Sequence, residues 1–164
     1  MDTNVVLVAN GQHHDVSLDC VAACALALQA LMRQGRLVLD DQFRILTEYQ
    51  NKTQPKTGNR PGDAFVKWAL NNRMKAQFVD LVVIREHEDR GFDSFPDNRA
   101  LATFDAPDRV FVAVAGAHAE QPPILQAADS KWLDWAPALT QHGIVVEFLC
   151  PDDIQKFHKN KFGV

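Results

Sequence analysis

Short apolar runs alternate with longer stretches that carry apolar residues at helical spacing, and this alternation constrains the fold more than any other feature of the chain. The apolar runs lie at residues 5–9, 36–39, 78–84, 124–128 and 144–150. Runs of this length suit strands, whereas the stretches between them are long enough to be helices. Strands that alternate with helices favour parallel pairing, because each helix returns the chain to the same edge of the sheet. The sequence therefore predicts an α/β domain with a mostly parallel sheet.

Local signals mark where several of the helices begin and end. Ser17 is a candidate N-cap for a helix that runs to about Gln34, and Gly35 follows it as a C-terminal stop. This helix is apolar on most sides, which predicts that it is buried or covered by a partner. Further helices are predicted over residues 41–50 with Asp40 as the cap, over 61–72 with Pro61 in the first turn, over 106–119, and around Trp132 and Trp135 with an interruption at Pro137.

Length and composition favour one soluble domain. The chain has 164 residues, 46% of them hydrophobic, which is enough to build one core. We expect a domain over residues 1–150 followed by a polar tail at 151–164. No uncharged apolar run approaches the ~18–20 residues that span a bilayer, so no membrane partner is expected. The N-terminus also lacks the pattern of a secretory signal.

The three cysteines, Cys20, Cys24 and Cys150, form an odd set without a disulfide spacing pattern. Such a set is typical of a reducing cytoplasm, which is the predicted location. His13 and His14 lie close to two of the cysteines in sequence and raise the question of zinc. No recognised ligand spacing is matched, however, and small buried cysteines are ordinary in an alanine-rich helix. A zinc site is therefore not predicted.

Asp108 is the carboxylate whose position is hardest to explain by structure alone. On a helix it shares one face with Phe111, Val112 and Ala115, and this face must be the core stripe. A buried carboxylate without a partner costs several kcal/mol or more. The alternative is an N-terminal charge that the helix dipole favours, worth ~0.3–1 kcal/mol. Asp105 suits that structural role better, because it precedes the helix as its natural N-cap.

Three more acids are placed in a similar way. Asp129 follows the apolar run at 124–128, where either it or Ser130 could instead cap a helix. Glu48 borders an apolar helical stripe, and Asp2 adjoins the run at 5–9. Clustered carboxylates repel one another unless they hold hard cations, and oxygen ligands suit Mg²⁺ or Mn²⁺. Such ions promote in-line displacement at phosphorus.

Four blocks in this order resemble the PIN-domain nuclease family. They are Asp2-Thr3-Asn4-Val5-Val6, the acid Glu48 in the second predicted helix region, Asp108 followed by RVFVAVA, and Asp129-Ser-Lys-Trp. The resemblance covers Asp2 to about Cys150. It implies a three-layer α/β/α domain with a twisted parallel sheet, in which Asp2, Glu48, Asp108 and Asp129 converge on one or two Mg²⁺ or Mn²⁺ ions as catalytic residues and metal ligands. Asp105 would assist from the outer shell.

The first block departs from the family pattern in one respect. In the family an apolar strand precedes the first aspartate, whereas here only Met1 does. Three explanations stay open: the first strand is shortened, an upstream start is missing, or Asn10 after the run at 5–9 takes the first position. We favour Asp2, because the whole Asp-Thr-Asn-Val-Val block fits.

The resemblance implies a metal-dependent endoribonuclease that hydrolyses phosphodiester bonds of single-stranded RNA and leaves 5′-phosphate and 3′-hydroxyl ends. Many members of the family are toxins held inactive by a cognate antitoxin protein, and homodimers are common, so both are partners that the resemblance implies. Two alternatives stay open. One is a structure-specific DNA nuclease on a related fold, and the other is a non-catalytic domain that binds RNA or a protein.

A basic loop is the candidate contact for nucleic acid. Residues 51–62 carry Lys52, Lys56 and Arg60 without an acid, in a chain whose net charge is −4. This net charge argues against a protein that coats nucleic acid by bulk electrostatics, but it is compatible with a local basic groove. The alternative to phosphate contact is a solvated loop with no ligand.

Overall fold

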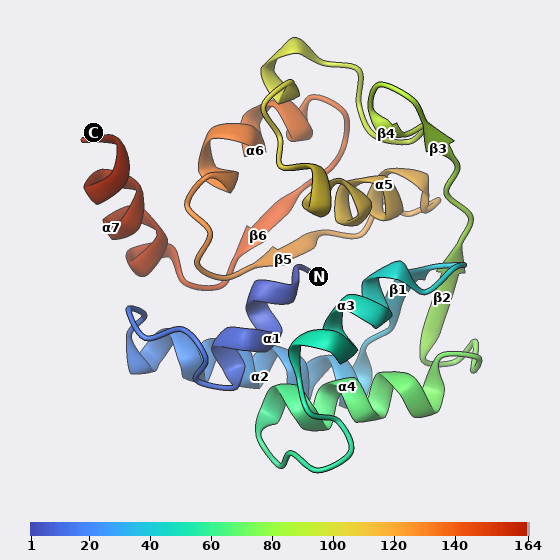
Figure 1. Cartoon of the computed structure of the whole chain (residues 1–164), viewed down its shortest axis with the longest axis vertical. Helices are drawn as coiled ribbons and strands as arrows, with labels where there is room; N and C mark the ends of the chain where they lie inside the picture. Colours follow the sequence, from blue (N-terminus) through green and yellow to red (C-terminus); the bar gives the residue numbers. More distant parts are fainter. Residues whose placement is uncertain (164) are drawn as a thin grey trace.

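The computed structural model describes residues 1–163, apart from the side chain of Phe162, and Figure 1 shows how its elements are arranged. Within this range the helices are α1 (Thr3–Ala9), α2 (Leu18–Gln34), α3 (Arg44–Lys52), α4 (Pro61–Asn72), α5 (Arg109–Ala117), α6 (Trp132–Thr140) and α7 (Pro151–Phe162). The strands are β1 (Leu37–Asp40), β2 (Val79–Val82), β3 (Glu86–His87), β4 (Gly91–Phe92), β5 (Ile124–Gln126) and β6 (Val146–Phe148), and two short 3₁₀ turns, η1 (Arg99–Leu101) and η2 (Ala106–Asp108), precede α5.

The strands pair as the alternation predicts, but in short pairs rather than in one sheet. Strands β1 and β2 are parallel, with Leu37 opposite Val79, and β5 and β6 are parallel, with Ile124 opposite Val146. Strands β3 and β4 form a small antiparallel pair. The protein is therefore a mixed α/β domain with two short parallel strand pairs among its helices. The sequence predicted one extended sheet, whereas the described residues form only separate pairs of strands.

The prediction of a strand at residues 5–9 is wrong, because these residues belong to helix α1. The side chain of Asp2 caps the helix by accepting a hydrogen bond of 2.7 Å from the backbone N–H of Asn4. Val5, Val6 and Val8 are buried on several sides of the helix. A helix buried nearly all round has no polar face, so its apolar run cannot be distinguished from a buried strand by periodicity.

The stretch predicted as a polar tail at 151–164 is mostly helical, because residues 151–162 form helix α7. Pro151 occupies the first turn, where its missing N–H has no consequence. Asp153 accepts hydrogen bonds from the backbone N–H of Ser17 at 3.0 Å and from its hydroxyl at 2.6 Å. Helix α7 is thereby docked on the start of α2, where Ser17 also caps α2 through the N–H of Cys20.

The structure further corrects the expectation that the cysteines form no disulfide. Cys20 and Cys150 are joined by a disulfide bond with Cα atoms 5.1 Å apart, while Cys24 is a free, buried thiol. The bond links the first turn of α2 to the residue just before α7. A separation of 130 residues leaves no local spacing pattern from which the pairing could have been predicted.

The helix boundaries follow the sequence signals more closely. Helix α2 runs from Leu18 to Gln34 as predicted, but it is not buried all round, because the side chains of Leu18 and Leu26 are 86% and 63% exposed. Helix α3 begins at Arg44, three residues later than predicted. Asp40 still caps it, since its two carboxylate oxygens accept the backbone N–H groups of Arg44 and Ile45.

Helix α6 is not interrupted at Pro137 as predicted, but continues through it to Thr140. Proline in the second turn removes only one N–H from the helix ladder. The fully buried side chain of Trp132 packs edge-to-face on Phe104, and Trp135 also contacts this ring. These contacts hold α6 against the segment that leads into α5.

A small hollow of about 70 Å³ lies beside the two parallel strand pairs and is lined by residues of both, including Leu37, Val38, Ile124 and Leu125. Met1 also lines it, and burial lowers the pKa of the α-amino group of Met1 to about 6, although the Asp2 carboxylate opposes this shift. No helix among the described residues is long and apolar enough to cross a membrane.

Candidate metal centre

Three carboxylates meet where the segment before α5 approaches the segment after β5. Asp105 precedes the short turn η2, Asp108 is its last residue, and Asp129 follows β5. One carboxylate oxygen from each lies within 4.8 Å of the others, and all three residues are half-buried. Of the three acids expected to approach one another, Glu48, Asp108 and Asp129, the structure brings Asp108 and Asp129 into this set but not Glu48.

Asp2 and Glu48 border this acid triad (Asp105, Asp108 and Asp129) from α1 and α3. Burial, and then the charges of Asp108 and Asp129, raise the pKa of Asp2 to about 7, even though the N–H of Asn4 stabilises the carboxylate. Neither Asp2 nor Glu48 belongs to the set whose oxygens lie within 4.8 Å. The sequence predicted that these two hold the metal directly or through water and that Asp105 assists from the outer shell, whereas the geometry places Asp105 inside the triad.

Asp108 is electrostatically the least satisfied member of the triad. Burial, followed by the charges of Asp129, Asp105 and Glu48, raises the pKa of Asp108 to about 6, and Lys131 opposes the shift only weakly. Asp108 occupies the N-cap position of α5, yet its side chain makes no capping hydrogen bond. No capping hydrogen bond therefore supports the alternative role of Asp108 as a charge that stabilises the helix N-terminus.

Asp105 and Asp129 also differ from the capping roles considered for them. Asp105 precedes η2 but accepts no capping bond; instead its carboxylate binds the ammonium of Lys131 at 2.6 Å. Asp129 accepts the backbone N–H of Lys131 at 3.1 Å, and α6 begins only at Trp132. Lys131 thus closes one side of the triad, and the hydrogen bond with Asp105 raises the pKa of its ammonium group.

The Asp-Thr-Asn triplet at the N-terminus ties three separate elements together. The backbone N–H of Asp2 donates to the carbonyl oxygen of Leu125 in β5 at 3.0 Å. The hydroxyl of Thr3 donates to Glu48 at 2.7 Å, and the side-chain oxygen of Asn4 accepts the N–H of Ala128 at 2.8 Å. Each of the three residues therefore holds α1 against one of the segments that contribute acids to the cluster.

Thr3, Asn4 and Lys131 are the residues near the centre that the sequence analysis did not identify. All three lie inside blocks on which the resemblance depends, directly after Asp2 or Asp129. The available signal was the presence of polar side chains beside an acid in otherwise apolar surroundings. Such side chains need partners when they are buried, and the nearest partners are the other acids and their backbone.

Asn10 does not take part in the acid cluster, which removes the alternative to Asp2. It lies at the opposite end of α1, where its side-chain oxygen accepts the backbone N–H of Gly62 at 2.7 Å and that of Asp63 at 3.2 Å. Its amide group donates to the Asp63 carboxylate at 3.0 Å. Asn10 therefore has a structural role in joining α1 to α4.

The basic loop is not part of the acid cluster either. In the view of Figure 1 the loop between α3 and α4 lies at the lower edge, while α5 and β5 lie in the upper half. Lys52 and Lys56 are exposed and form no ion pair within the described part of the chain. Arg60 differs from them, because its guanidinium binds the buried carboxylate of Asp63 at 3.3 Å.

The chemistry of this donor set fits a hard divalent cation. The triad, Glu48 and Asp2 offer only carboxylate oxygens, which suit Mg²⁺ and Mn²⁺, and no sulfur or imidazole ligand joins the triad among residues 1–163. His13 does not join these acids, and its ring stacks on Phe157 with ring centres 5.8 Å apart. Without a cation, burial and the charges of the neighbouring acids favour the protonated forms of Asp2 and Asp108.

Comparison with known proteins gives no match: no family model, no curated protein and no solved structure is similar to this chain. The functional assignment below therefore depends on the residues and their geometry.

Proposed function

We propose that the protein is a Mg²⁺- or Mn²⁺-dependent nuclease that hydrolyses phosphodiester bonds of single-stranded RNA, on a three-layer α/β/α domain of the PIN type. The observation that carries the proposal is the convergence of Asp105, Asp108 and Asp129 within 4.8 Å, with Asp2 and Glu48 beside them. Four regions of the chain contribute these acids, so no local structural requirement accounts for their meeting.

The arrangement of the strands supports the PIN-type part of the proposal. Two parallel pairs, β1–β2 and β5–β6, lie on either side of the start of α1, and Asp2 follows Met1 at the hollow lined by both pairs. The N–H of Asp2 already pairs with Leu125 in β5. In a PIN-like domain the first aspartate ends a central strand, and the contacts of Met1 and Asp2 with the strand pairs support assigning that role to Asp2.

The roles of the side chains follow from their contacts. Asp108 and Asp129 would hold the cation, with Glu48 and Asp2 as further ligands, directly or through water. A cation bound there would supply activation of the attacking water and neutralisation of charge at phosphorus. Thr3 holds Glu48 in place, Asn4 holds the loop that carries Asp129, and Lys131 neutralises Asp105.

The raised pKa values of Asp2 and Asp108 are consistent with this role. A group with a pKa of about 6 or 7 exchanges a proton for a cation near neutral pH, so protons and metal compete for the same oxygens. The set of acids is complete, which favours catalysis over the alternative of a non-catalytic module that binds RNA or a protein. The fold and the site leave the structure-specific DNA nuclease as the second substrate class to test.

A cognate antitoxin and a homodimer remain proposals for the partners of the protein. The feature that supports a partner is the outer face of α2, where the side chains of Leu18 and Leu26 are largely exposed. Exposed large apolar side chains are unfavourable in water, so a chain that covers them stabilises the protein.

The decisive experiment replaces Asp108 with Asn, which removes the charge and keeps the shape. We expect Mn²⁺-dependent cleavage of single-stranded RNA to fall by about 100-fold or more, as is common when a group that stabilises the transition state is lost. The melting temperature measured with a chelator should hold or rise, because the repulsion from Asp129, Asp105 and Glu48 disappears.

Asp97→Asn is a matched control, because Asp97 is an exposed acid in another loop. It should leave both cleavage and melting unchanged. A fully active Asp108→Asn protein with a lowered melting temperature would refute the catalytic assignment and restore the role of a helix N-terminal charge. Parallel assays with single-stranded RNA and branched DNA separate the two substrate classes.

A further inference from the structure

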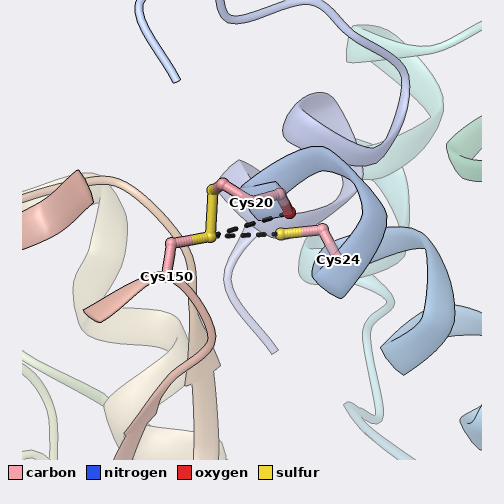
Figure 2. A group of neighbouring side chains, drawn as sticks. All are labelled: Cys20, Cys24 and Cys150. Atoms are coloured by element: carbon pink, nitrogen blue, oxygen red, sulfur yellow. Dashed lines mark hydrogen bonds between the residues drawn. A yellow bond between two sulfur atoms is a disulfide. The ribbon is translucent and has the colours of Figure 1, made fainter. Parts of the chain in front are cut away.

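The three cysteines form a second cluster, which shares no residue with the acid triad. Cys20 and Cys24 lie one turn apart on α2, and Cys150 comes from the segment between β6 and α7. All three are buried, with exposed fractions of 2%, 0% and 3%. Figure 2 shows the side chain of Cys24 pointing at the sulfur of Cys150, which is bonded to Cys20.

Cys24 is placed as a third ligand rather than as a packing residue alone. Its sulfur lies 3.9 Å from that of Cys150, and the sulfurs of all three cysteines lie within 4.8 Å of one another. Two thiolates that bind one ion at ~2.3 Å are separated by slightly less than 4 Å. The distance between Cys24 and Cys150 is therefore already that of two ligands of a single ion.

Reduction of the disulfide would complete this set. A dithiol reductant supplies two electrons and two protons, the Cys20–Cys150 bond breaks, and the reductant leaves as its own disulfide. The freed sulfurs can no longer remain at bonding distance and separate toward van der Waals contact. The result is three thiols from two elements at spacings near those of a trigonal sulfur site.

The surroundings favour a soft ion over a hard one. No carboxylate or imidazole joins the three sulfurs within the described residues, and thiolate ligands select Zn²⁺ or Cu⁺ over Mg²⁺. An open surface pocket lined by Cys20, Cys150 and Asp152 adjoins the cluster and offers an entry path for an ion or a reductant. Burial also raises the pKa of the Cys24 thiol to about 12, which keeps it protonated and unreactive until an ion replaces the proton.

We propose that Cys20, Cys24 and Cys150 form a redox-gated site that binds one soft, thiophilic cation of the Zn²⁺ or Cu⁺ class when the disulfide is reduced and none when it is intact. Binding forms three metal–sulfur bonds and releases three protons. The site lies where α2 meets the start of α7, so the same residues join these two helices by a disulfide in one state and by a metal in the other.

Titration of the full chain with Cd²⁺ tests the proposal, because cadmium–thiolate bonds give an ultraviolet charge-transfer band that carboxylates do not give. The reduced protein, freed of reductant without air, should develop this band with one equivalent of Cd²⁺, and the oxidised protein should not. Competition with Zn²⁺ and Cu⁺ then ranks the two biological ions. The Asp108→Asn variant should give the same band as the wild type, which separates this site from the acid cluster.

Cys24→Ala is the critical variant, because it leaves the Cys20–Cys150 disulfide and hence the oxidised fold intact. After reduction it should bind Cd²⁺ at least about ten-fold more weakly than the wild type. Equal binding by this variant, or no band in the reduced wild type, overturns the proposal. Where reduction alone unfolds the chain, Cd²⁺ should restore the circular dichroism of the wild type but not of Cys24→Ala, and failure to restore the wild type also overturns it.

Discussion

A buried carboxylate lies at each end of helix α1, Asp2 at its start and Asp63 of α4 at its C-terminal end, and the pKa values of the two shift in opposite directions. At its C-terminal end, Asp63 is fully buried and its oxygens accept hydrogen bonds from the backbone N–H of Gln54, the amide of Asn10 and the guanidinium of Arg60. Burial opposes ionisation of Asp63, but these bonds outweigh it and hold its pKa below the usual range. At the N-terminal end, the pKa of Asp2 is raised to about 7.

The difference lies in what the neighbours supply. Asp63 is surrounded by donors and one cation, and the close approach of α4 to α1 depends on Gly62, where an added Cβ would lie 2.4 Å from the carbonyl oxygen of Val6. Asp2 and Asp108 are surrounded by other acids. Asp2 accepts one capping hydrogen bond, from the N–H of Asn4, and Asp108 accepts none. A carboxylate with a structural role is satisfied by the protein, whereas the acid cluster is left for a ligand to satisfy.

The largest expected effect on stability comes from Asp63→Asn. The new amide keeps one acceptor oxygen, so its N–H₂ group faces either the donors of Gln54 and Asn10 or the guanidinium of Arg60, and the ion pair with Arg60 is lost in both orientations. We expect the free energy of unfolding to fall by about 3 kcal/mol, because breaking a buried, charged hydrogen-bond network is among the costliest substitutions. Urea denaturation measures this loss. A loss below ~1 kcal/mol would show that Asp63 and the acid cluster are not as different as their contacts indicate.

Asp2→Asn should have the opposite effect, and it should depend on pH. The folded-state pKa of Asp2 is raised, so the unfolded chain releases this proton at lower pH, and wild-type stability without metal falls as pH rises from about 4 to 7. Asn keeps the N-cap and removes the titration. The variant should match the wild type at pH 4 and exceed it by about 2 kcal/mol at pH 7, as each pKa unit corresponds to ~1.4 kcal/mol before allowance for relaxation.

Thermal unfolding at a series of pH values provides the measurement for Asp2→Asn. The α-amino group of Met1, whose pKa is lowered, shifts stability in the other direction between pH 6 and 8, and it is present in both proteins. Parallel stability curves for the two proteins from pH 4 to 7 would contradict the raised pKa of Asp2.

Mn²⁺ should stabilise the acid cluster as the hydrogen-bond donors and Arg60 stabilise Asp63 at the other end of α1. At ten times its dissociation constant, a cation that binds only the folded state adds about 1.4 kcal/mol of stability. The apparent affinity should weaken as pH falls below about 6, because Asp108 and Asp2 then hold protons. Calorimetric titration at pH 5 and pH 8 tests this, with Asp108→Asn as the variant that should bind weakly at both. Equal affinity at the two pH values would place the cation elsewhere.

The smallest effect on stability is expected in the basic loop, where the structure separates residues that the sequence grouped together. Lys52→Gln with Lys56→Gln should change the free energy of unfolding by less than ~0.5 kcal/mol, since both side chains are exposed. If they contact phosphates, the salt dependence of RNA binding should flatten by about 1.4 in slope. Arg60→Gln should instead destabilise the protein, because it removes the cation of Asp63. An unchanged salt slope in the double variant would leave the two lysines as a solvated loop.

The sequence by itself determined the features that depend on neighbours along the chain. The bounds of α2 followed from Ser17 and Gly35, the cap of α3 from Asp40, and the start of α4 from Pro61, because capping and backbone preferences act over a few residues. Alternation of apolar runs with helices predicted parallel strand pairing, because a helix between two strands returns the chain to the same edge of a sheet. The proximity of Asp108 and Asp129 was also predictable, since each lies at the end of a core element.

Only the tertiary structure decided which apolar run became a helix and which acids came closest. The sequence of residues 5–9 suits a strand or a helix equally well, because burial on several sides removes the periodicity that distinguishes the two. The N-cap supplied by Asp2 and its backbone contact with Leu125 accompany the helical form. Asp105 joined the triad through Lys131, a partner 26 residues away. The Cys20–Cys150 disulfide and the docking of α7 join residues 130 or more positions apart. Such contacts follow from how the elements pack in space, and local sequence carries no signal for that packing.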